Sequence, residues 1–237
     1  MTSVWAHRGA SAAAPENTIP AFELAVEHGA DGVEFDVQLT ADGHPVVFHD
    51  EKLQRITGAP GRVRETTLEQ LRQLDASTGR EGFAGTRVPT LDEALELLAP
   101  TGVWINIELK TNRVADGLEE SVISLIDDYE VRGRSSVSSF HHKSLRYLAR
   151  IDPGLRLGTL YSDPILRPWR YAVELGTQAL HARMDSVTGK LIDKCHAHLL
   201  QVAVWTVDDK DDIKRMAQLG ADAIITNHPQ RAARLLR

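Results

Sequence analysis

The chain has 237 residues, of which 42% are hydrophobic and 25% are charged, and its formal net charge is -6. This composition is that of a soluble globular protein with enough apolar residues for a large core. The 27 lysines and arginines form no run, which argues against a nucleic-acid partner.

The cysteine count and the chain's N-terminal residues bear on its location. Cys195 is the only cysteine, so the sequence excludes an intrachain disulfide and is compatible with a reducing compartment. The N-terminal residues enter a predicted strand almost at once and leave no room for a signal peptide. No apolar stretch approaches the roughly 20 residues that span a membrane. We therefore expect a cytoplasmic protein. Nothing in the sequence indicates an oligomeric state.

Strand-like and helix-like segments alternate along the chain in eight successive pairs. Predicted strands cover residues 4–8, 32–40, 103–109, 135–140, 155–160, 178–182, 201–207 and 223–226. Predicted helices cover residues 18–28, 91–99, 115–129, 143–150, 168–175, 188–197, 209–219 and 229–236. Thr90 and Glu93 are spaced as a capping box for the second helix.

Eight such pairs in this length predict an α/β fold, namely a closed TIM-type (β/α)8 barrel formed by one domain over residues 1–237. An open doubly wound sheet is the alternative. No Gly-x-Gly-x-x-Gly motif follows the first strand, which argues against dinucleotide binding.

The alternation is interrupted after the second strand. Asp42-Gly43 between two apolar runs is a strong signal for a hairpin with a two-residue loop. With that loop, Asp36 faces His49. The glycine-rich stretch that follows completes a small insertion over about residues 41–88, in which we expect one helix near residues 68–74.

Charged side chains gather at the predicted C-terminal ends of the first three strands, where barrels carry their active sites. Glu34 and Asp36 share one face of the second strand, because strand side chains alternate. Glu108 and Lys110 are related in the same way on the third strand, and Arg8 ends the first. Oxygen-only ligands predict a divalent ion such as Mg2+ or Ca2+, and the two cations are suited to a phosphate.

Each of these residues has a plainer interpretation when taken alone. A Glu-x-Asp pair is usually a solvated face, Glu108-x-Lys110 is a surface ion pair, and a lone His7 or His49 is a hydrogen-bonded structural histidine. However, apolar residues flank Glu34 and Asp36, so their acidic face must point to the barrel's centre. Taken together, the group predicts a functional site.

Short motifs run in order along nearly the whole chain. The first group is His7-Arg8-Gly9, Pro15-Glu16-Asn17-Thr18, Glu34-Phe35-Asp36-Val37 and His49-Asp50. The later ones are Val88-Pro89-Thr90-Leu91, Asn106-Ile107-Glu108-Leu109-Lys110, Ser139-Phe140, Val204-Trp205-Thr206-Val207 and Ile225-Thr226-Asn227-His228-Pro229. In this order they resemble the glycerophosphodiester phosphodiesterase family. The first group is highly specific and the later ones are individually weak. The resemblance implies a TIM-type barrel with a small insertion after the second strand.

The resemblance also implies a role for each member of the cluster. Glu34, Asp36 and Glu108 would bind the metal, and His7 and His49 would be the general acid and base. Arg8 and Lys110 would contact the phosphate. Phe140 and Trp205 would lie near the substrate. Asn17 would either support the site or cap the first helix. Many relatives have an asparagine at position 208, where Asp208 is a good helix cap.

The implied reaction is metal-dependent hydrolysis of a small-molecule glycerophosphodiester to sn-glycerol 3-phosphate and an alcohol, by His/His general acid–base catalysis. Either histidine could be the acid, and either water or a glycerol hydroxyl could attack. The nearest rival is a phospholipase on the same barrel, with residues 161–171 as an apolar lip. A metal-dependent aldolase and a barrel that only binds are further alternatives. Two histidines fit the aldolase poorly, and the retained site residues disfavour a mere binding protein.

Overall fold

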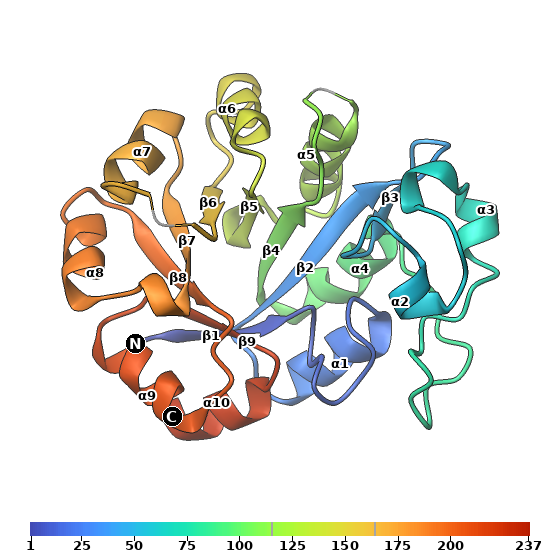
Figure 1. The fold of residues 1–237 in the computed structure, drawn as a ribbon, viewed down its shortest axis with the longest axis horizontal. Coiled ribbons are helices and arrows are strands. Elements are labelled where there is room, and N and C mark those ends of the chain that lie inside the picture. The colour runs from blue at the N-terminus through green and yellow to red at the C-terminus, as the bar shows by residue number, and fades with distance from the viewer. Residues whose placement is uncertain (115, 164) are drawn as a thin grey trace.

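Eight parallel strands close into a barrel that helices surround (Figure 1). The computed structural model describes residues 1–114, 116–163 and 165–237. The barrel strands are β1 (Ser3–His7), β2 (Gly32–Leu39), β4 (Trp104–Leu109), β5 (Ser135–Ser139), β6 (Leu157–Tyr161), β7 (Ala179–Arg183), β8 (Gln201–Trp205) and β9 (Ala223–Thr226). Their order is β1-β9-β8-β7-β6-β5-β4-β2, and β2 pairs with β1 to close the ring. The predicted barrel is confirmed, and the open sheet is excluded.

The predicted helices are present within a few residues of their expected bounds. They are α1 (Ile19–Glu27), α4 (Leu91–Leu98), α5 (Leu118–Asp128), α6 (His142–Ile151), α7 (Pro168–Leu175), α8 (Gly189–His196), α9 (Lys210–Gln218) and α10 (Pro229–Leu236). The helix expected over 115–129 begins at Leu118, and position 115 lies outside the described residues. The capping box of α4 is confirmed, since Thr90 and Glu93 exchange side-chain and backbone hydrogen bonds. No helix within the described ranges is long and apolar enough to cross a membrane.

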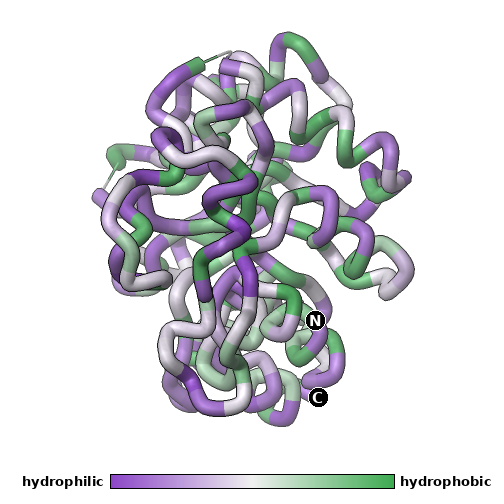
Figure 2. Tube along the Cα trace, turned by 90° about the vertical axis from the view of Figure 1, so that its right-hand side faces the viewer, coloured by the Kyte–Doolittle hydropathy of each residue, from purple (hydrophilic) through white to green (hydrophobic). Residues whose placement is uncertain are grey.

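The alternation of side chains along β2 separates the core from the site. Val33, Phe35 and Val37 belong to the apolar layer between barrel and helices, where Phe35 contacts Phe22 of α1 with ring centroids 5.3 Å apart. Because successive side chains of a strand point to opposite faces, Glu34 and Asp36 point away from this layer, into the barrel. Hydrophobic and hydrophilic residues alternate at short intervals along the whole trace (Figure 2).

The hairpin after β2 has a different register from the predicted one. Strand β3 (Pro45–Val47) pairs antiparallel with β2, and the Phe48 amide donates to the Asp36 carbonyl at 2.9 Å. Asp36 is thus opposite Phe48 and not His49. The loop has three residues, 41–43, and Gly43 adopts the left-handed conformation (φ 80°) that such loops require. The expected two-residue loop was wrong by one position.

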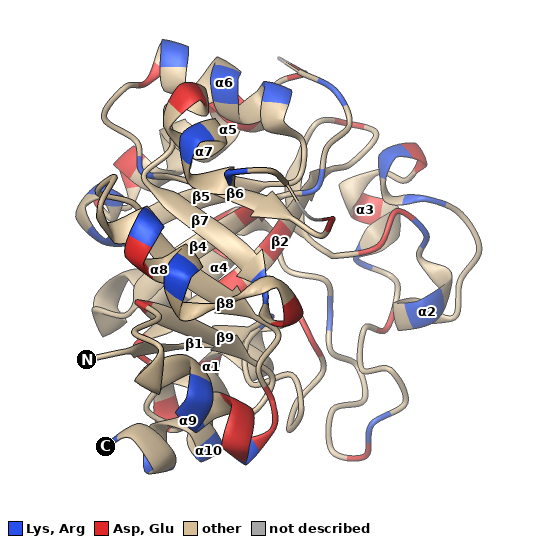
Figure 3. Cartoon of the chain, turned by 60° about the vertical axis from the view of Figure 1, so that its left-hand side comes forward, with Lys and Arg blue, Asp and Glu red and all other residues tan. Residues whose placement is uncertain are grey.

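The segment between β3 and α4 carries more helix than expected. It contains α2 (Gln54–Thr57), the 3-10 turn η1 (Val63–Glu65) and α3 (Leu68–Leu71), the last shorter than the predicted 68–74. Together they form a small apolar cluster of their own beside the barrel (Figure 3). A capping box starts α3, and the Asp42 carboxylate accepts from the Leu68 amide at 3.0 Å, so the hairpin loop and α3 are tied together.

Candidate active site

A cavity of about 170 Å3 opens at the C-terminal ends of the barrel strands. It contains most of the residues that the sequence selected. They are His7, Arg8, Glu34, His49, Glu108, Lys110, Phe140 and Trp205. Asp36 and Asn17 are buried beside it and contact its walls, as described below. The predicted cluster therefore lies in one place.

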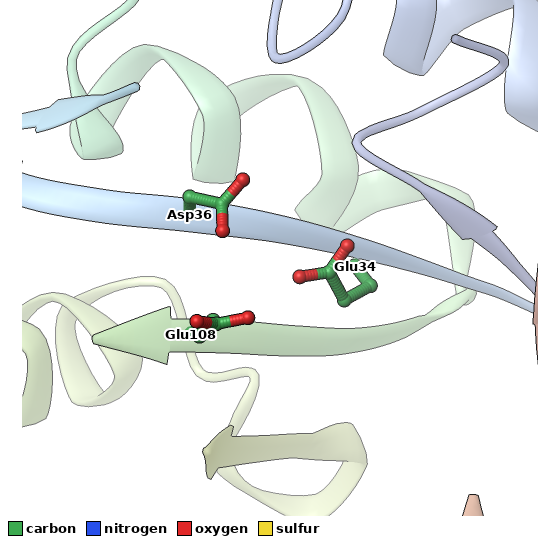
Figure 4. A group of neighbouring side chains, drawn as sticks. All are labelled: Glu34, Asp36 and Glu108. Carbon is green, nitrogen blue, oxygen red and sulfur yellow. The ribbon is translucent and has the colours of Figure 1, made fainter. Parts of the chain in front are cut away.

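Three buried carboxylates form the centre of the site (Figure 4). Glu34 and Asp36 come from β2 and Glu108 from β4, and one oxygen of each lies within 4.8 Å of the other two. The register explains the convergence, because Asp36 is directly opposite Glu108 in the parallel pair of β2 and β4. A group of three carboxylates at this spacing is able to hold a divalent metal ion.

Two cations lie against these carboxylates. Arg8 Nε is 3.3 Å from one oxygen of Asp36, and Lys110 Nζ is 3.2 Å from the other. Lys110 also pairs with Glu108. Two positive charges oppose three negative ones, so the buried cluster keeps an excess negative charge when all three carboxylates are ionised.

The carboxylates share this excess unequally. Burial, followed by repulsion from Asp36, raises the pKa of Glu108 to about 7. The same two causes raise the pKa of Glu34 well above its usual range. Burial also acts on Asp36, but Lys110 and Arg8 outweigh it and lower the pKa of Asp36 to about 2. Near neutral pH, protons or a metal cation would each reduce this excess charge.

His7 is held by the opposite end of the chain. Its Nδ1 lies 2.7 Å from Oδ1 of Asn227, which follows β9. Asp208 orients this amide, because its carboxylate accepts from Asn227 Nδ2 at 2.6 Å and cannot donate. The Asn227 oxygen must then face His7 and accept its Nδ1–H, which leaves His7 Nε2 as the free acceptor. Burial, helped by Arg8, lowers the pKa of His7 to about 4.

The interpretation of Asp208 as a helix cap was wrong. Asp209 caps α9, since its side chain accepts from the Asp211 amide at 2.8 Å. Asp208 instead accepts from Asn227 and from the Thr226 hydroxyl at 2.9 Å.

His49 has a carboxylate partner where His7 has an amide. Asp50 Oδ1 lies 2.6 Å from His49 Nδ1, and Arg55 binds Asp50 through two nitrogens at 2.6 and 2.9 Å. The Glu16 carboxylate connects Arg55 to Arg8, because it accepts a hydrogen bond of 2.8 Å from each guanidinium. This chain of ion pairs connects the segment after β3 to the first loop. Burial lowers the pKa of His49, although Asp36 and Asp50 oppose that effect.

Asn17 reaches the carboxylate cluster and does not cap α1. Its Nδ2 donates to Asp36 Oδ2 at 2.7 Å, and its Oδ1 accepts from the Asp36 amide at 3.3 Å. The residue at the cap position is Thr18. Of the two roles expected for Asn17, the fold provides the contact with the carboxylate cluster, through Asp36.

Phe140 and Trp205 form an aromatic wall at the mouth of the cavity. Their rings meet edge to face with centroids 5.7 Å apart, and Lys110 Nζ lies 5.7 Å from the Phe140 centroid. Phe140 remains 42% exposed. The wall therefore offers an apolar surface directly beside the charged centre.

A second, larger groove of about 730 Å3 continues outward from the cavity. The two share His49, Glu108, Lys110 and Phe140. Beyond these, the groove is lined mainly by polar and charged side chains, among them Arg62, Arg64, Arg113 and Asp116. The charged side chains make the groove suited to a polar group.

The apolar lip considered in residues 161–171 is largely part of the core. Ile165 and Trp169 pack against the buried cluster around β7 and β8, and the Tyr171 hydroxyl bonds His142 Nδ1 at 2.9 Å. Leu166 is exposed, and position 164 lies outside the described residues.

Sequence reasoning quoted Asn227, Asp50 and Glu16 in motifs but gave them no role. Asp50 directly follows His49, a signal that could have been used. Asn227 is 220 positions from His7, and only closure of the barrel brings β9 beside β1. His181, which lines the inner part of the cavity, was not singled out at all.

Comparison with known proteins identifies this arrangement. The family model described as "Glycerophosphoryl diester phosphodiesterase family" matches residues 7–231. The chain belongs to this family of hydrolases. A "Glycerophosphodiester phosphodiesterase" of Caldanaerobacter subterraneus is 43% identical, covering 100% of this chain and 98% of the relative. One of Bacillus altitudinis is 39% identical, covering 99% and 98%.

Solved structures of the same family agree with the fold. An Oleispira antarctica phosphodiesterase, solved in complex with the product sn-glycerol-3-phosphate, has a TM-score of 0.88 and 30% identity, covering 100% of this chain and 97% of that one. A putative glycerophosphoryl diester phosphodiesterase from Silicibacter pomeroyi has a TM-score of 0.90 and 29% identity, covering 100% and 93%.

Proposed function

We propose that this enzyme hydrolyses glycerophosphodiesters to sn-glycerol 3-phosphate and an alcohol, with a divalent metal and with His7 and His49 as the proton-transfer residues. The observation that carries the proposal is the buried carboxylate cluster with two cations and two histidines around one cavity. The family assignment supports the reaction class, and the product named for the Oleispira antarctica structure supports the product. The whole chain would act as one catalytic domain.

Glu34, Asp36 and Glu108 would hold the metal. The raised pKa values of Glu34 and Glu108 support this assignment, because they reflect burial and then repulsion between carboxylates, and a bound cation opposes both effects. Three oxygen ligands favour Mg2+ or Ca2+ over softer ions. When bound, such an ion supplies charge neutralisation at the phosphate.

Arg8 and Lys110 would bind the phosphate. Arg8 Nε is buried and, although it lies 3.3 Å from Asp36 Oδ2, it makes no hydrogen bond among the described residues, so this donor could serve a phosphate. Guanidinium and ammonium groups beside a phosphodiester stabilise the negative charge that grows on its oxygens in the transition state.

The hydrogen bonds of the two histidines support a different role for each. His7 donates Nδ1–H to Asn227 and is neutral, so its Nε2 lone pair would take the proton from the attacking hydroxyl. The Asp50 carboxylate favours the imidazolium form of His49 and opposes the burial that lowers the pKa of this histidine. An anionic substrate beside it adds to that effect. His49 would then give its proton to the leaving alcohol.

The outer groove favours a polar head group and argues against the lysophospholipase alternative. The choice can be measured directly, by comparing glycerophosphocholine with lysophosphatidylcholine. We expect activity on the first substrate. A preference for the second would reverse the assignment.

The central experiment measures glycerol 3-phosphate release from a panel of glycerophosphodiesters after EDTA treatment, followed by addition of Mg2+ or Ca2+. We expect activity to disappear with EDTA and to return with one of these ions. Glu34→Gln should stay inactive after metal addition, whereas Glu96→Gln, on the exposed side of α4, should behave as the unmodified enzyme. Activity that survives in a verified metal-free sample would contradict the metal's role.

A further inference from the structure

His181 is a buried histidine that the proposed acid–base chemistry does not use. It lies in β7, two residues before the strand's end, and is 1% exposed. Neither ring nitrogen has a hydrogen-bond partner among the described residues. Burial lowers the pKa of its imidazole to about 4, so the ring is neutral. Buried polar atoms in folded proteins nearly always have partners, so this ring requires one.

The neighbouring strand β6 has a glycine, Gly158, where a larger residue would clash with the His181 ring. A Cβ atom at Gly158, on β6, would lie 2.6 Å from His181 Nε2. On another side, the ring meets Trp5 of β1 edge-on at a centroid distance of 6.0 Å. Its backbone carbonyl accepts from Trp205 Nε1 at 3.0 Å, which ties it to the aromatic wall. The imidazole is thus held in place with Nε2 against Gly158, and neither ring nitrogen is hydrogen-bonded by the described residues.

The imidazole borders the active-site cavity from within the barrel. The residues that line the cavity include Asn106, Ser138 and His181 together with Glu34 and Glu108 of the carboxylate cluster. Asn106 and Ser138 already bond each other at 3.0 Å, and the Asn106 oxygen accepts from Ser136 at 2.8 Å. His181 is therefore the lining group at this depth whose hydrogen-bonding capacity is unused among the described residues.

We propose that His181 hydrogen-bonds the terminal hydroxyl of the substrate's glycerol and so selects glycerol over alcohols that lack this hydroxyl. This inference rests on the proposed function. A neutral imidazole has one N–H donor and one acceptor, and a hydroxyl is likewise both. With the phosphate at Arg8 and Lys110, one alcohol of the diester enters the enclosed cavity and the other extends into the outer groove. The enclosed one is the glycerol, and the groove accepts varied head groups.

The test compares two substrates that differ by one hydroxyl. Glycerophosphocholine has the terminal hydroxyl, and 2-hydroxypropyl phosphocholine lacks it. Both keep the hydroxyl next to the phosphate, so attack by water and attack by this hydroxyl are possible with either substrate. We expect the unmodified enzyme to prefer the first by about 10- to 100-fold in kcat/KM, since a buried partner left unpaired is unfavourable. His181→Leu should lose that preference by slowing only the first substrate. His181→Asn, with a donor and an acceptor, should restore part of it.

A matched variant separates this role from general stability. Thr177→Val removes a buried hydroxyl four positions earlier, which bonds Thr159 at 2.7 Å. Thr177 lines neither the active-site cavity nor a second cavity of about 110 Å3, which His181 lines together with Trp5 and Trp104. It should lower the melting temperature without changing the substrate ratio. An unchanged ratio in the His181 variants would overturn the inference and leave His181 as a structural residue satisfied by water.

A measurement on the unmodified enzyme does not depend on whether the variants fold. The 15N shifts of the His181 ring in the unmodified, metal-loaded enzyme should move on addition of glycerol 3-phosphate, and much less with 2-hydroxypropyl phosphate. Equal responses to the two ligands would also overturn the inference. If the unmodified enzyme releases no glycerol 3-phosphate from any diester, the proposed function itself fails, and this outcome is distinct from an unchanged ratio.

Discussion

His7 and Asn227 lie 220 positions apart in the chain and are joined by a hydrogen bond of 2.7 Å between Nδ1 and Oδ1. Asp208 sets the orientation of the amide, and the amide sets the tautomer of the histidine. The proton on Nδ1 is thus determined by a carboxylate that does not touch the ring. This is the logic by which a third group orients a catalytic base, with a neutral amide placed between the carboxylate and the imidazole.

Exchanging the two supporting residues should shift the pH dependence of the reaction. The double variant Asp208→Asn/Asn227→Asp keeps the hydrogen bonds, because the introduced amide would donate to the introduced carboxylate, but it places the negative charge beside His7. The charge favours the imidazolium and raises the pKa of His7 from about 4. A base must be neutral to act, so activity should be lost at a higher pH on acidification. The acid limb of kcat/KM should move up by roughly one unit or more.

The control for this shift is Asn227→Ala, which removes the oriented amide without adding charge. It should lower kcat without an upward shift of the acid limb. An acid limb that stays in place in the double variant would show that His7 does not titrate in this limb.

Removing either histidine should reduce turnover strongly while the fold is retained. We expect His7→Ala and His49→Ala to lower kcat by about 10²–10⁴-fold, the usual contribution of a general acid or base. Glycerol 3-phosphate release measures the rate, and thermal unfolding checks the fold. His198→Ala is the control, because the His198 side chain is exposed and its ring bonds only the Lys194 carbonyl among the described residues. Near-normal turnover in either site variant would contradict the assignment.

Metal binding should be visible as stabilisation, independently of activity. Adding Mg2+ or Ca2+ to the chelated protein should raise its melting temperature, since a ligand that binds only the folded state stabilises it. The gain should vanish in Asp36→Asn and in Glu34→Gln. The same rise in these variants would place the ion elsewhere.

The carboxylate cluster was predictable from sequence, whereas the partners of its histidines were not. Residues 34 and 36 must share a face of a strand, and parallel neighbouring strands bring 108 beside them. The hairpin register depended on finer chemistry: the Thr40 hydroxyl accepts from the His44 amide at 2.9 Å and closes a three-residue loop. Asn227 reaches His7 only because the last strand pairs with the first. A lone histidine on a strand, as His181 is, carries no sequence signal for its missing partners.

The raised pKa of Glu108 should make the metal-free protein lose stability as the pH rises. The pKa of this carboxyl is about 7 in the folded protein and 4.5 in its ordinary state, so the folded protein binds more protons between these values. The contribution of the Glu108 carboxyl to the free energy of unfolding is therefore fully present below about pH 4.5, and it is lost as the pH rises toward about 7. His7 and His181 act in the opposite direction below pH 6.5, because their pKa values are lowered to about 4.

The measurement is accordingly a difference between two proteins. Unfolding free energies of the metal-free enzyme and of Glu108→Gln should be compared at several pH values from about 4.5 to about 7.5, the range over which this carboxyl titrates. Glutamine mimics the protonated carboxyl and does not ionise, so the variant should gain stability relative to the unmodified protein as the pH rises, while both histidine contributions cancel. Saturating metal should reverse this difference, because the ionised carboxylate is then the favoured form. A difference that does not vary with pH in the metal-free proteins would mean that Glu108 ionises with its ordinary pKa, and that burial and repulsion from Asp36 do not raise it.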